Sequence, residues 1–262
     1  MSQTTAALLG ASAGFTVFIG LPVARLRGLK PPVQGFLNAI ATGVLVFLLW
    51  DILAHASAPV ESAIATLRNG DSQPFLLLAV IFAAALGMGL LSLVYLNSRL
   101  LGGRRDTPVG ASPKVLSMMI AAGLGLHNLS EGLAIGQSAA TGAMAFAGVL
   151  VIGFALHNVT EGFGIAAPMS LERSPVSWGF IGMAGLVGGG PTFIGTVLGY
   201  VVVSPYAYVL FLALAAGALI YVINELFALG RRLCKPPAMA WGLLLGFLAA
   251  YSTDLLLTYL AV

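Results

Sequence analysis

Charged residues are scarce in this sequence. Lys, Arg, Asp and Glu make up 8% of its 262 residues, whereas about 25% is usual for a soluble domain. Hydrophobic residues make up 59%. A chain with so few charges cannot cover a globular surface with polar groups. The composition therefore excludes a soluble protein and predicts an integral membrane protein in a lipid bilayer.

Cysteine is almost absent as well. The single Cys234 excludes a disulfide within the chain and gives no sign of a cysteine metal cluster.

The first residues, MSQTT, place no positive charge before the first apolar run, so we expect a retained span and not a cleaved signal peptide. The net charge of +3 fits basic residues in the connections of a membrane protein, and no nucleic-acid partner is expected.

Long apolar runs fill the chain, and each could cross roughly 30 Å of hydrocarbon as a helix. We expect an all-α fold, a polytopic membrane helix bundle that forms a single transmembrane domain over 1–262. The eight predicted spans are 5–26, 34–57, 75–98, 114–139, 142–168, 175–201, 205–230 and 237–260.

The basic residues divide unequally between the two sides of this bundle. Arg68 stands alone after the second span. The other eleven lie in the connections on the opposite side: Arg25, Arg27, Lys30, Arg99, Arg104, Arg105, Lys114, Arg173, Arg231, Arg232 and Lys235. By the positive-inside rule, this division predicts that both termini face away from the cytoplasm.

Ionisable residues within the spans are few, and they include all three histidines: Asp51, His55, His127, Glu131, His157, Glu161, Glu225 and Asp254. A central charge costs roughly 2.5–3.5 kcal/mol on insertion scales, so such residues persist where they line a cavity, pair or bind an ion. Half of them belong to a repeated motif. The sequence LHNLSEGLAIG occupies 126–136, and LHNVTEGFGIA occupies 156–166.

The histidine and the glutamate of each copy share one helix face, because they are four residues apart. A short connection makes the two helices antiparallel neighbours, so two imidazoles and two carboxylates can converge at mid-membrane. This set suits a divalent first-row metal, zinc first among the candidates. The alternative is a polar pair that only joins two helices, but packing alone does not account for two matching copies.

Neighbouring polar residues extend this prediction. Asn128 and Asn158 lie about 100° around their helices from the histidines, where their amide oxygens could bind a second metal bridged by both glutamates. Ser130 and Thr160 are expected to bond back to a carbonyl one turn earlier, with metal ligation as the alternative.

Glycine is frequent inside the spans, with 33 residues in the chain. Gly132 and Gly136 form a GxxxG pair, as do Gly185 and Gly189, which predicts close helix packing. Gly132 and Gly162 directly follow the two glutamates, and we expect them also to keep side-chain bulk away from the ligands.

The segments HNLSEG and HNVTEG resemble the ZIP family of divalent-metal transporters, in which they occur in this order. Eight spans, outward termini and chain length fit as well. The resemblance implies a single transporter domain in the cell membrane that imports zinc or a related metal through a binuclear centre between the fourth and fifth spans. It implies His127, Glu131, His157 and Glu161 as primary ligands, with Asn128, Asn158 and the same glutamates holding the second metal.

The sequence also departs from this family. Proline is common in members where Ser130 and Thr160 stand here. Some bacterial members complete the second metal site with a glutamate in the sixth span, but GLVGGGPTFIG at 185–195 has glycine there. A second site is therefore expected to be weak or absent. The segment 102–113 replaces the histidine-rich loop of many members, so metal sensing by such a loop is not expected.

Four further ionisable residues are candidates for a metal pathway. Asp51 and His55 are again four residues apart, near the outer end of the second span, and Asp254 lies at a similar depth on the eighth. They could collect cations at an entrance, or they could be solvated at the membrane interface. Glu225 lies toward the cytoplasmic end of the seventh span, either as an exit ligand or as a partner of Arg231 or Arg232.

Two other functions compete with transport. A membrane-embedded zinc metallohydrolase would use the same ligands to activate water, but the sequence has no HExxH or GxSxG motif and both glutamates serve as ligands. A helical receptor or scaffold would use the polar residues only as bridges. Iron, manganese, cobalt, nickel and cadmium remain alternatives to zinc. Proton coupling and a homodimer are left open.

Overall fold

The computed structural model describes residues 2–25, 30–101, 112–169, 172, 174–202 and 204–261, and every regular element in them is helical. The predicted first span is divided into α1 (Gln3–Phe15), α2 (Val17–Gly20) and the 3-10 turn η1 (Leu21–Arg25). The remaining helices are α3 (Pro31–Ser62), α4 (Ile64–Arg68), α5 (Gln73–Leu101), α6 (Pro113–Ala140), α7 (Met144–Met169), α8 (Trp178–Val201), α9 (Pro205–Leu233) and α10 (Pro236–Ala261).

The predicted polytopic helix bundle is confirmed. Seven helical segments in the described residues are long and apolar enough to cross a membrane. The helix α6 is not among them, although its 28 residues are sufficient in length, because its polar side chains lower its hydropathy. More than half of its residues are buried, so protein and not lipid surrounds those side chains. The count of eight spans stays a prediction.

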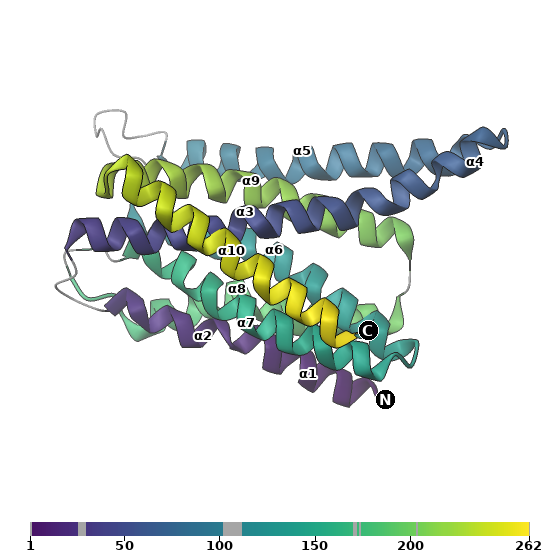
Figure 1. Cartoon of the computed structure of the whole chain (residues 1–262), viewed down its shortest axis with the longest axis horizontal. Helices are drawn as coiled ribbons and strands as arrows, with labels where there is room; N and C mark the ends of the chain where they lie inside the picture. The colour runs from purple at the N-terminus through teal and green to yellow at the C-terminus, as the bar shows by residue number, and fades with distance from the viewer. Residues whose placement is uncertain are drawn as a thin grey trace.

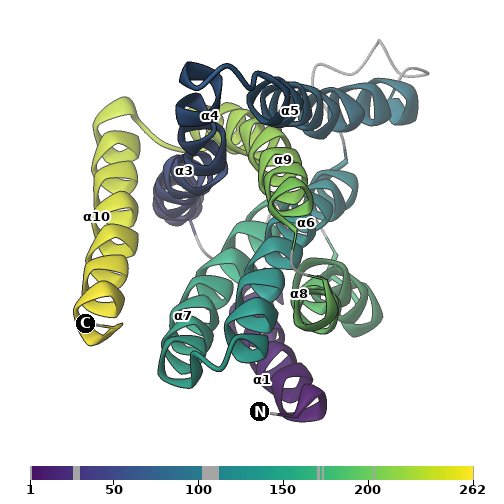
Figure 2. The ribbon, with the colours of Figure 1, turned by 90° about the vertical axis from the view of Figure 1, so that its right-hand side faces the viewer.

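The helices form two groups that pack against each other (Figure 2). One group contains α3, α5, α9 and α10, and the other contains α1, α6, α7 and α8. The two groups meet where α6 packs on α9, and where α7 packs on α3 and α10. Both copies of the repeated motif lie in the second group, on α6 and α7, beside this boundary.

Backbone-to-backbone contacts hold α6 against α8. A Cβ atom at Gly195 of α8 would collide with the carbonyl oxygen of Leu129, and one at Gly199 would collide with that of Leu133. On α6, a Cβ at Gly136 would collide with the carbonyl oxygen of Thr196. Small residues let helices approach this closely in a membrane, and the predicted packing role of the GxxxG glycines is confirmed at this interface.

Both chain termini lie at the same end of the bundle, with α4 and Arg68 (Figure 1). The helix α3 has 32 residues, about 48 Å of α-helix, and therefore exceeds a bilayer core of roughly 30 Å. The other described basic residues lie at the opposite end: Arg25, Lys30, Arg99, Lys114, Arg231, Arg232 and Lys235. Arg27, Arg104, Arg105 and Arg173 lie outside the described residues. Which end faces the cytoplasm stays a prediction.

The glycine contacts of α8 predict unequal effects of alanine at two nearby positions. At Gly190 an added Cβ meets no atom within 4 Å, whereas at Gly195 it meets the α6 backbone. We expect Gly195→Ala to lower the free energy of unfolding by about 1–3 kcal/mol through overpacking. Gly190→Ala should be neutral or stabilising, because alanine is the better helix former. Thermal unfolding of the purified protein measures both, and equal effects would contradict this packing.

The division of basic residues predicts the orientation of the bundle. In a Cys234→Ser background, Asp71→Cys lies between α4 and α5, and Lys235→Cys lies between α9 and α10. A membrane-impermeant thiol reagent applied to intact cells should label the first variant and not the second. Labelling after lysis controls for reactivity. The reverse pattern in intact cells would refute outward-facing termini.

Candidate metal centre

The turn between α6 and α7 brings the two copies of the motif together. The helix α6 ends at Ala140 and α7 begins at Met144, so residues 141–143 form the connection. Within it, Gly142 has a φ of 82°, a conformation that residues with a side chain rarely adopt. The helices on either side are in contact, and the short turn makes them antiparallel. The predicted proximity of the two motifs is therefore present in the structure.

All six candidate ligands of the motif lie inside the protein. Each has an exposed fraction of 8% or less, and the two asparagines are fully buried: His127, Asn128, Glu131, His157, Asn158 and Glu161. Polar and charged groups at such depth are costly unless a partner compensates for the lost water. The contacts of these side chains therefore indicate what the site can do.

His127 lies between the two glutamates. Its Nε2 atom is 3.3 Å from Oε1 of Glu131 on the same helix and 3.5 Å from Oε1 of Glu161 on α7. Neither approach has hydrogen-bond geometry. Within the described part of the chain, both nitrogens of His127, both oxygens of Glu131 and Oε1 of Glu161 are buried without a hydrogen-bond partner. Imidazole nitrogen and carboxylate oxygen are the ligand atoms that zinc and related metals prefer.

His157 adds a second imidazole from α7. Both of its ring nitrogens are buried without a hydrogen-bond partner among the described residues. The same described residues contain no group of three or more His, Cys, Asp or Glu side chains that is already spaced to hold a metal ion. Rotation of side chains is therefore needed before His127, Glu131, His157 and Glu161 can coordinate one ion together.

The two asparagines make different contacts, although their motifs match. Asn128 donates from Nδ2 to Oε2 of Glu161 at 2.9 Å and to the carbonyl oxygen of Gly188 on α8 at 3.0 Å. Asn158 donates from Nδ2 to the carbonyl oxygen of Ala13 on α1 at 3.0 Å. The first amide thus contacts a candidate ligand, Glu161, whereas the second connects α1 with α7.

The hydroxyl groups of the motif bond back to their own helices, as predicted. Ser130 donates to the carbonyl oxygen of His127 at 2.6 Å, and Thr160 donates to that of His157 at 2.7 Å. These bonds satisfy two buried or half-buried hydroxyls and occupy the carbonyls at the start of each motif. The structure therefore supports the backbone role for these two residues.

The prediction that Gly132 and Gly162 keep bulk away from the ligands is wrong. A Cβ at Gly132 would collide with the carbonyl oxygen of Thr192 on α8, and one at Gly162 would collide with that of Val17 on α2. Each glycine lies about 100° around its helix from the preceding glutamate, so it faces a different neighbour. Their small size serves close helix packing.

A cavity of about 350 Å³ leads to the ligands from the end of the bundle that carries both termini. Its lining comes from α3, α6, α7, α9 and α10. The ionisable side chains in that lining are Asp51, His55, His127, Glu131, His157 and Asp254. The structure therefore places the predicted entrance residues and three of the predicted ligands on one continuous space.

Asp51 and His55 form a contact at the exposed end of this cavity. Nδ1 of His55 is 3.3 Å from Oδ1 of Asp51 and 2.9 Å from its backbone carbonyl oxygen. The side chain of His55 is 60% exposed and that of Asp51 is 32% exposed, so water reaches both. Asp254 faces the same space from α10. The geometry thus gathers two carboxylates and one imidazole at the exposed end of the cavity.

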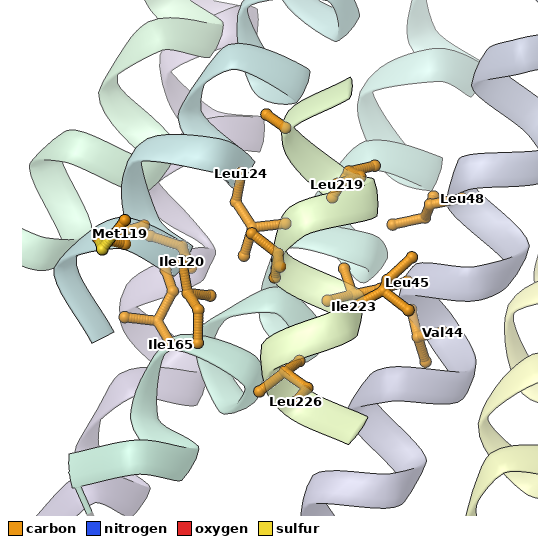
Figure 3. Close-up of a cluster of buried hydrophobic side chains, with 14 of the residues drawn as sticks. Val44, Leu45, Leu48, Met119, Ile120, Leu124, Ile165, Leu219, Ile223 and Leu226 are labelled. Carbon is orange, nitrogen blue, oxygen red and sulfur yellow. The ribbon is translucent and has the colours of Figure 1, made fainter. Parts of the chain in front are cut away.

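An apolar cluster lies beside the centre, toward the basic end of the bundle, and Figure 3 shows many of its side chains. Ile120 and Leu124 precede His127 on α6, and Ile165 follows Glu161 by one turn on α7. These side chains pack with residues of α3 and α9: Val44, Leu45, Leu48, Leu219, Ile223 and Leu226. On α6 and α7, the described residues that line the cavity extend no farther toward the basic end of the bundle than His127 and His157.

Glu225 lies on α9 beyond the cavity, beside this cluster. It does not line the cavity with the other candidate pathway residues, and it is half-buried. Among the described residues it forms no ion pair within 4.0 Å, so neither Arg231 nor Arg232 is a direct partner. The structure thus separates Glu225 from the entrance residues.

Sequence reasoning missed Tyr208, which lines the cavity from the first turns of α9. Its hydroxyl-bearing ring faces the space that also contains Asp51. No sequence signal distinguished it, because a tyrosine near the end of a span is typical of the aromatic belt at a membrane interface. Its position depends on the packing of α9 beside α3, which the local sequence does not specify.

Comparison with known proteins agrees with these features. The family model described as ZIP Zinc transporter matches residues 99–249, more than half of the chain, and this range includes both copies of the motif. No curated protein matches the chain.

Proposed function

This chain belongs to the ZIP zinc transporter family, whose members move metal ions across membranes, and on that premise we propose that it carries divalent transition-metal ions, zinc foremost, into the cytoplasm. We place the transported ion at His127, Glu131, His157 and Glu161, between α6 and α7. The observation that carries this proposal is the set of buried imidazole and carboxylate atoms without partners at the inner end of an open cavity.

The chemistry of this set supports a divalent ion as the substrate. Two carboxylates balance the charge of one divalent cation, and two neutral imidazoles add nitrogen ligands without adding charge. Such a site can replace the water that the ion loses on leaving solution. The ligands lack a rigid ready-made spacing, which suits an ion that has to be released again.

The cavity supports a direction of uptake. Asp51, His55 and Asp254 lie at its exposed end, where negative charge raises the local concentration of cations. That end carries both termini, and the positive-inside rule assigns it to the outside. An ion captured there would pass inward to the ligands, and the apolar cluster beyond them would have to open before release.

Removal of ligand atoms tests the site. We expect Glu161→Gln and His157→Ala each to reduce zinc uptake into sealed proteoliposomes at least about tenfold, because each variant loses a ligand. Glu61→Gln is the matched control, since Glu61 is exposed at the end of α3 and should leave uptake unchanged. Unfolding temperature and yield in membranes identify misfolded variants. Full zinc uptake by a folded Glu161→Gln variant would contradict the proposed site.

Neutralising the entrance carboxylates tests the uptake direction. We expect Asp51→Asn combined with Asp254→Asn to raise the apparent KM for outside zinc several-fold and to leave maximal uptake nearly unchanged. The effect should shrink as salt is added, because exposed charges are screened over about 8–10 Å at physiological salt. Glu61→Gln again controls for general surface charge. A loss of maximal rate at constant KM would contradict a capture role.

A further inference from the structure

Asn128 is placed as a hydrogen-bond donor within the candidate metal centre. Its side chain is fully buried, and its Nδ2 lies 2.9 Å from Oε2 of Glu161 and 3.0 Å from the Gly188 carbonyl oxygen. A backbone carbonyl can only accept a hydrogen bond, so it fixes which end of the amide faces α8. Each hydrogen of the NH2 group then has its own acceptor, one on Glu161 and one on Gly188. These two acceptors fix the orientation of the amide.

In this orientation the amide oxygen of Asn128 points away from Oε2 of Glu161, which accepts the hydrogen bond from the NH2 group. Asn128 Oδ1 is buried without a hydrogen-bond partner in the described residues. Bringing it to the Glu161 carboxylate would place it against the Gly188 carbonyl oxygen, and two acceptors at hydrogen-bond distance repel each other. The Gly188 carbonyl therefore opposes use of the amide oxygen as a ligand beside Glu161.

We propose that Asn128 is a positioning residue whose NH2 group occupies the place of a second cation beside Glu161, so that the centre holds a single divalent ion. This inference rests on the proposed function, and it names the stoichiometry of that same site. Asn128 holds Oε2 of Glu161 and leaves Oε1, which faces His127, for the transported ion. Hydrogen bonds to a carboxylate are roughly twice as strong as neutral ones, so this one can fix the side chain.

Charge balance leads to the same stoichiometry. The buried carboxylates of the centre are Glu131 and Glu161, which together neutralise one divalent cation. On α8, the segment 185–195 that passes the centre contains no acidic residue. A second divalent ion would leave two uncompensated positive charges at this depth, which is strongly unfavourable.

The matching asparagine of the second motif does not restore a second site. Asn158 donates to the carbonyl oxygen of Ala13, at the end of α1 where the first span is interrupted. The Thr16 hydroxyl lies within hydrogen-bond distance of the same carbonyl oxygen, at 2.6 Å, and of that of Ala155, at 2.8 Å. Asn158 is therefore engaged in a contact between α1 and α7, and its variant serves as a matched control.

Zinc stoichiometry in the full-length protein tests the proposal. The parent protein carries Asp51→Asn and Asp254→Asn, which remove the entrance carboxylates. The number of bound zinc ions then refers to the centre alone. Bound zinc is measured by equilibrium dialysis of the protein in lipid nanodiscs, and thermal unfolding confirms the fold. We expect one zinc per chain in the parent and in the Asn158→Ala control, which loses the hydrogen bond to the Ala13 carbonyl oxygen.

Two substitutions of Asn128 distinguish positioning from ligation. Asn128→Ala should retain one zinc with at least tenfold weaker affinity, because Glu161 loses its donor. Asn128→Asp adds a third carboxylate and should raise the count to two zinc ions per chain.

A ligand role for Asn128 would instead give two zinc ions in the parent and one in Asn128→Ala. That result would overturn the proposal even if Asn128→Asp fails to fold. Two zinc ions per chain in the parent, with normal uptake, would refute only the proposed stoichiometry. A parent that neither binds nor takes up zinc would refute the proposed function as well.

Discussion

Two carboxylates buried in the middle of a membrane bundle impose the constraint on which the rest of this structure depends. Glu131 and Glu161 are almost fully enclosed, and each has at least one oxygen without a hydrogen-bond partner in the described residues. Burial of an unpaired carboxylate costs several kcal/mol, so a positive partner is needed. His127 approaches both glutamates without forming a hydrogen bond, so it leaves their free oxygens without a hydrogen-bond partner. In the proposed function, a divalent metal ion supplies the positive charge that these carboxylates need.

This constraint explains why α6 is surrounded by protein. A helix with His127, Asn128 and Glu131 is poorly suited to face lipid, and α6 falls outside the segments apolar enough to span a membrane. Glycines at its interface with α8 let the two backbones touch, so the helix gains dense packing on the face next to its polar residues. The same close approach brings the Gly188 carbonyl within reach of Asn128. Packing and polar chemistry are thus two consequences of one helix contact.

The sequence predicts those parts of the site that depend on a single helix or a short connection. The spacing of His127 and Glu131, its repetition at His157 and Glu161, and the short turn between the helices suffice to place the four side chains together. Asp51 and His55 follow the same periodicity, and the structure gives them a common cavity with Asp254. What the sequence does not predict depends on long-range neighbours. The second asparagine faces α1, and the glycines after the glutamates face α2 and α8, because those helices pack there.

Access to the centre is unequal at its two ends, and the inequality has a structural origin. Carboxylates and imidazoles line the cavity on the side of the centre toward both termini, whereas aliphatic side chains pack on the side toward the basic end. An ion that has exchanged water for protein ligands cannot cross an aliphatic cluster without losing those ligands. The cluster draws Ile120 and Ile165 from one helix group and Leu45 and Ile223 from the other. For the proposed transport, a path toward the basic end therefore has to open at the boundary between the two groups, where the same aliphatic contacts also hold the bundle together.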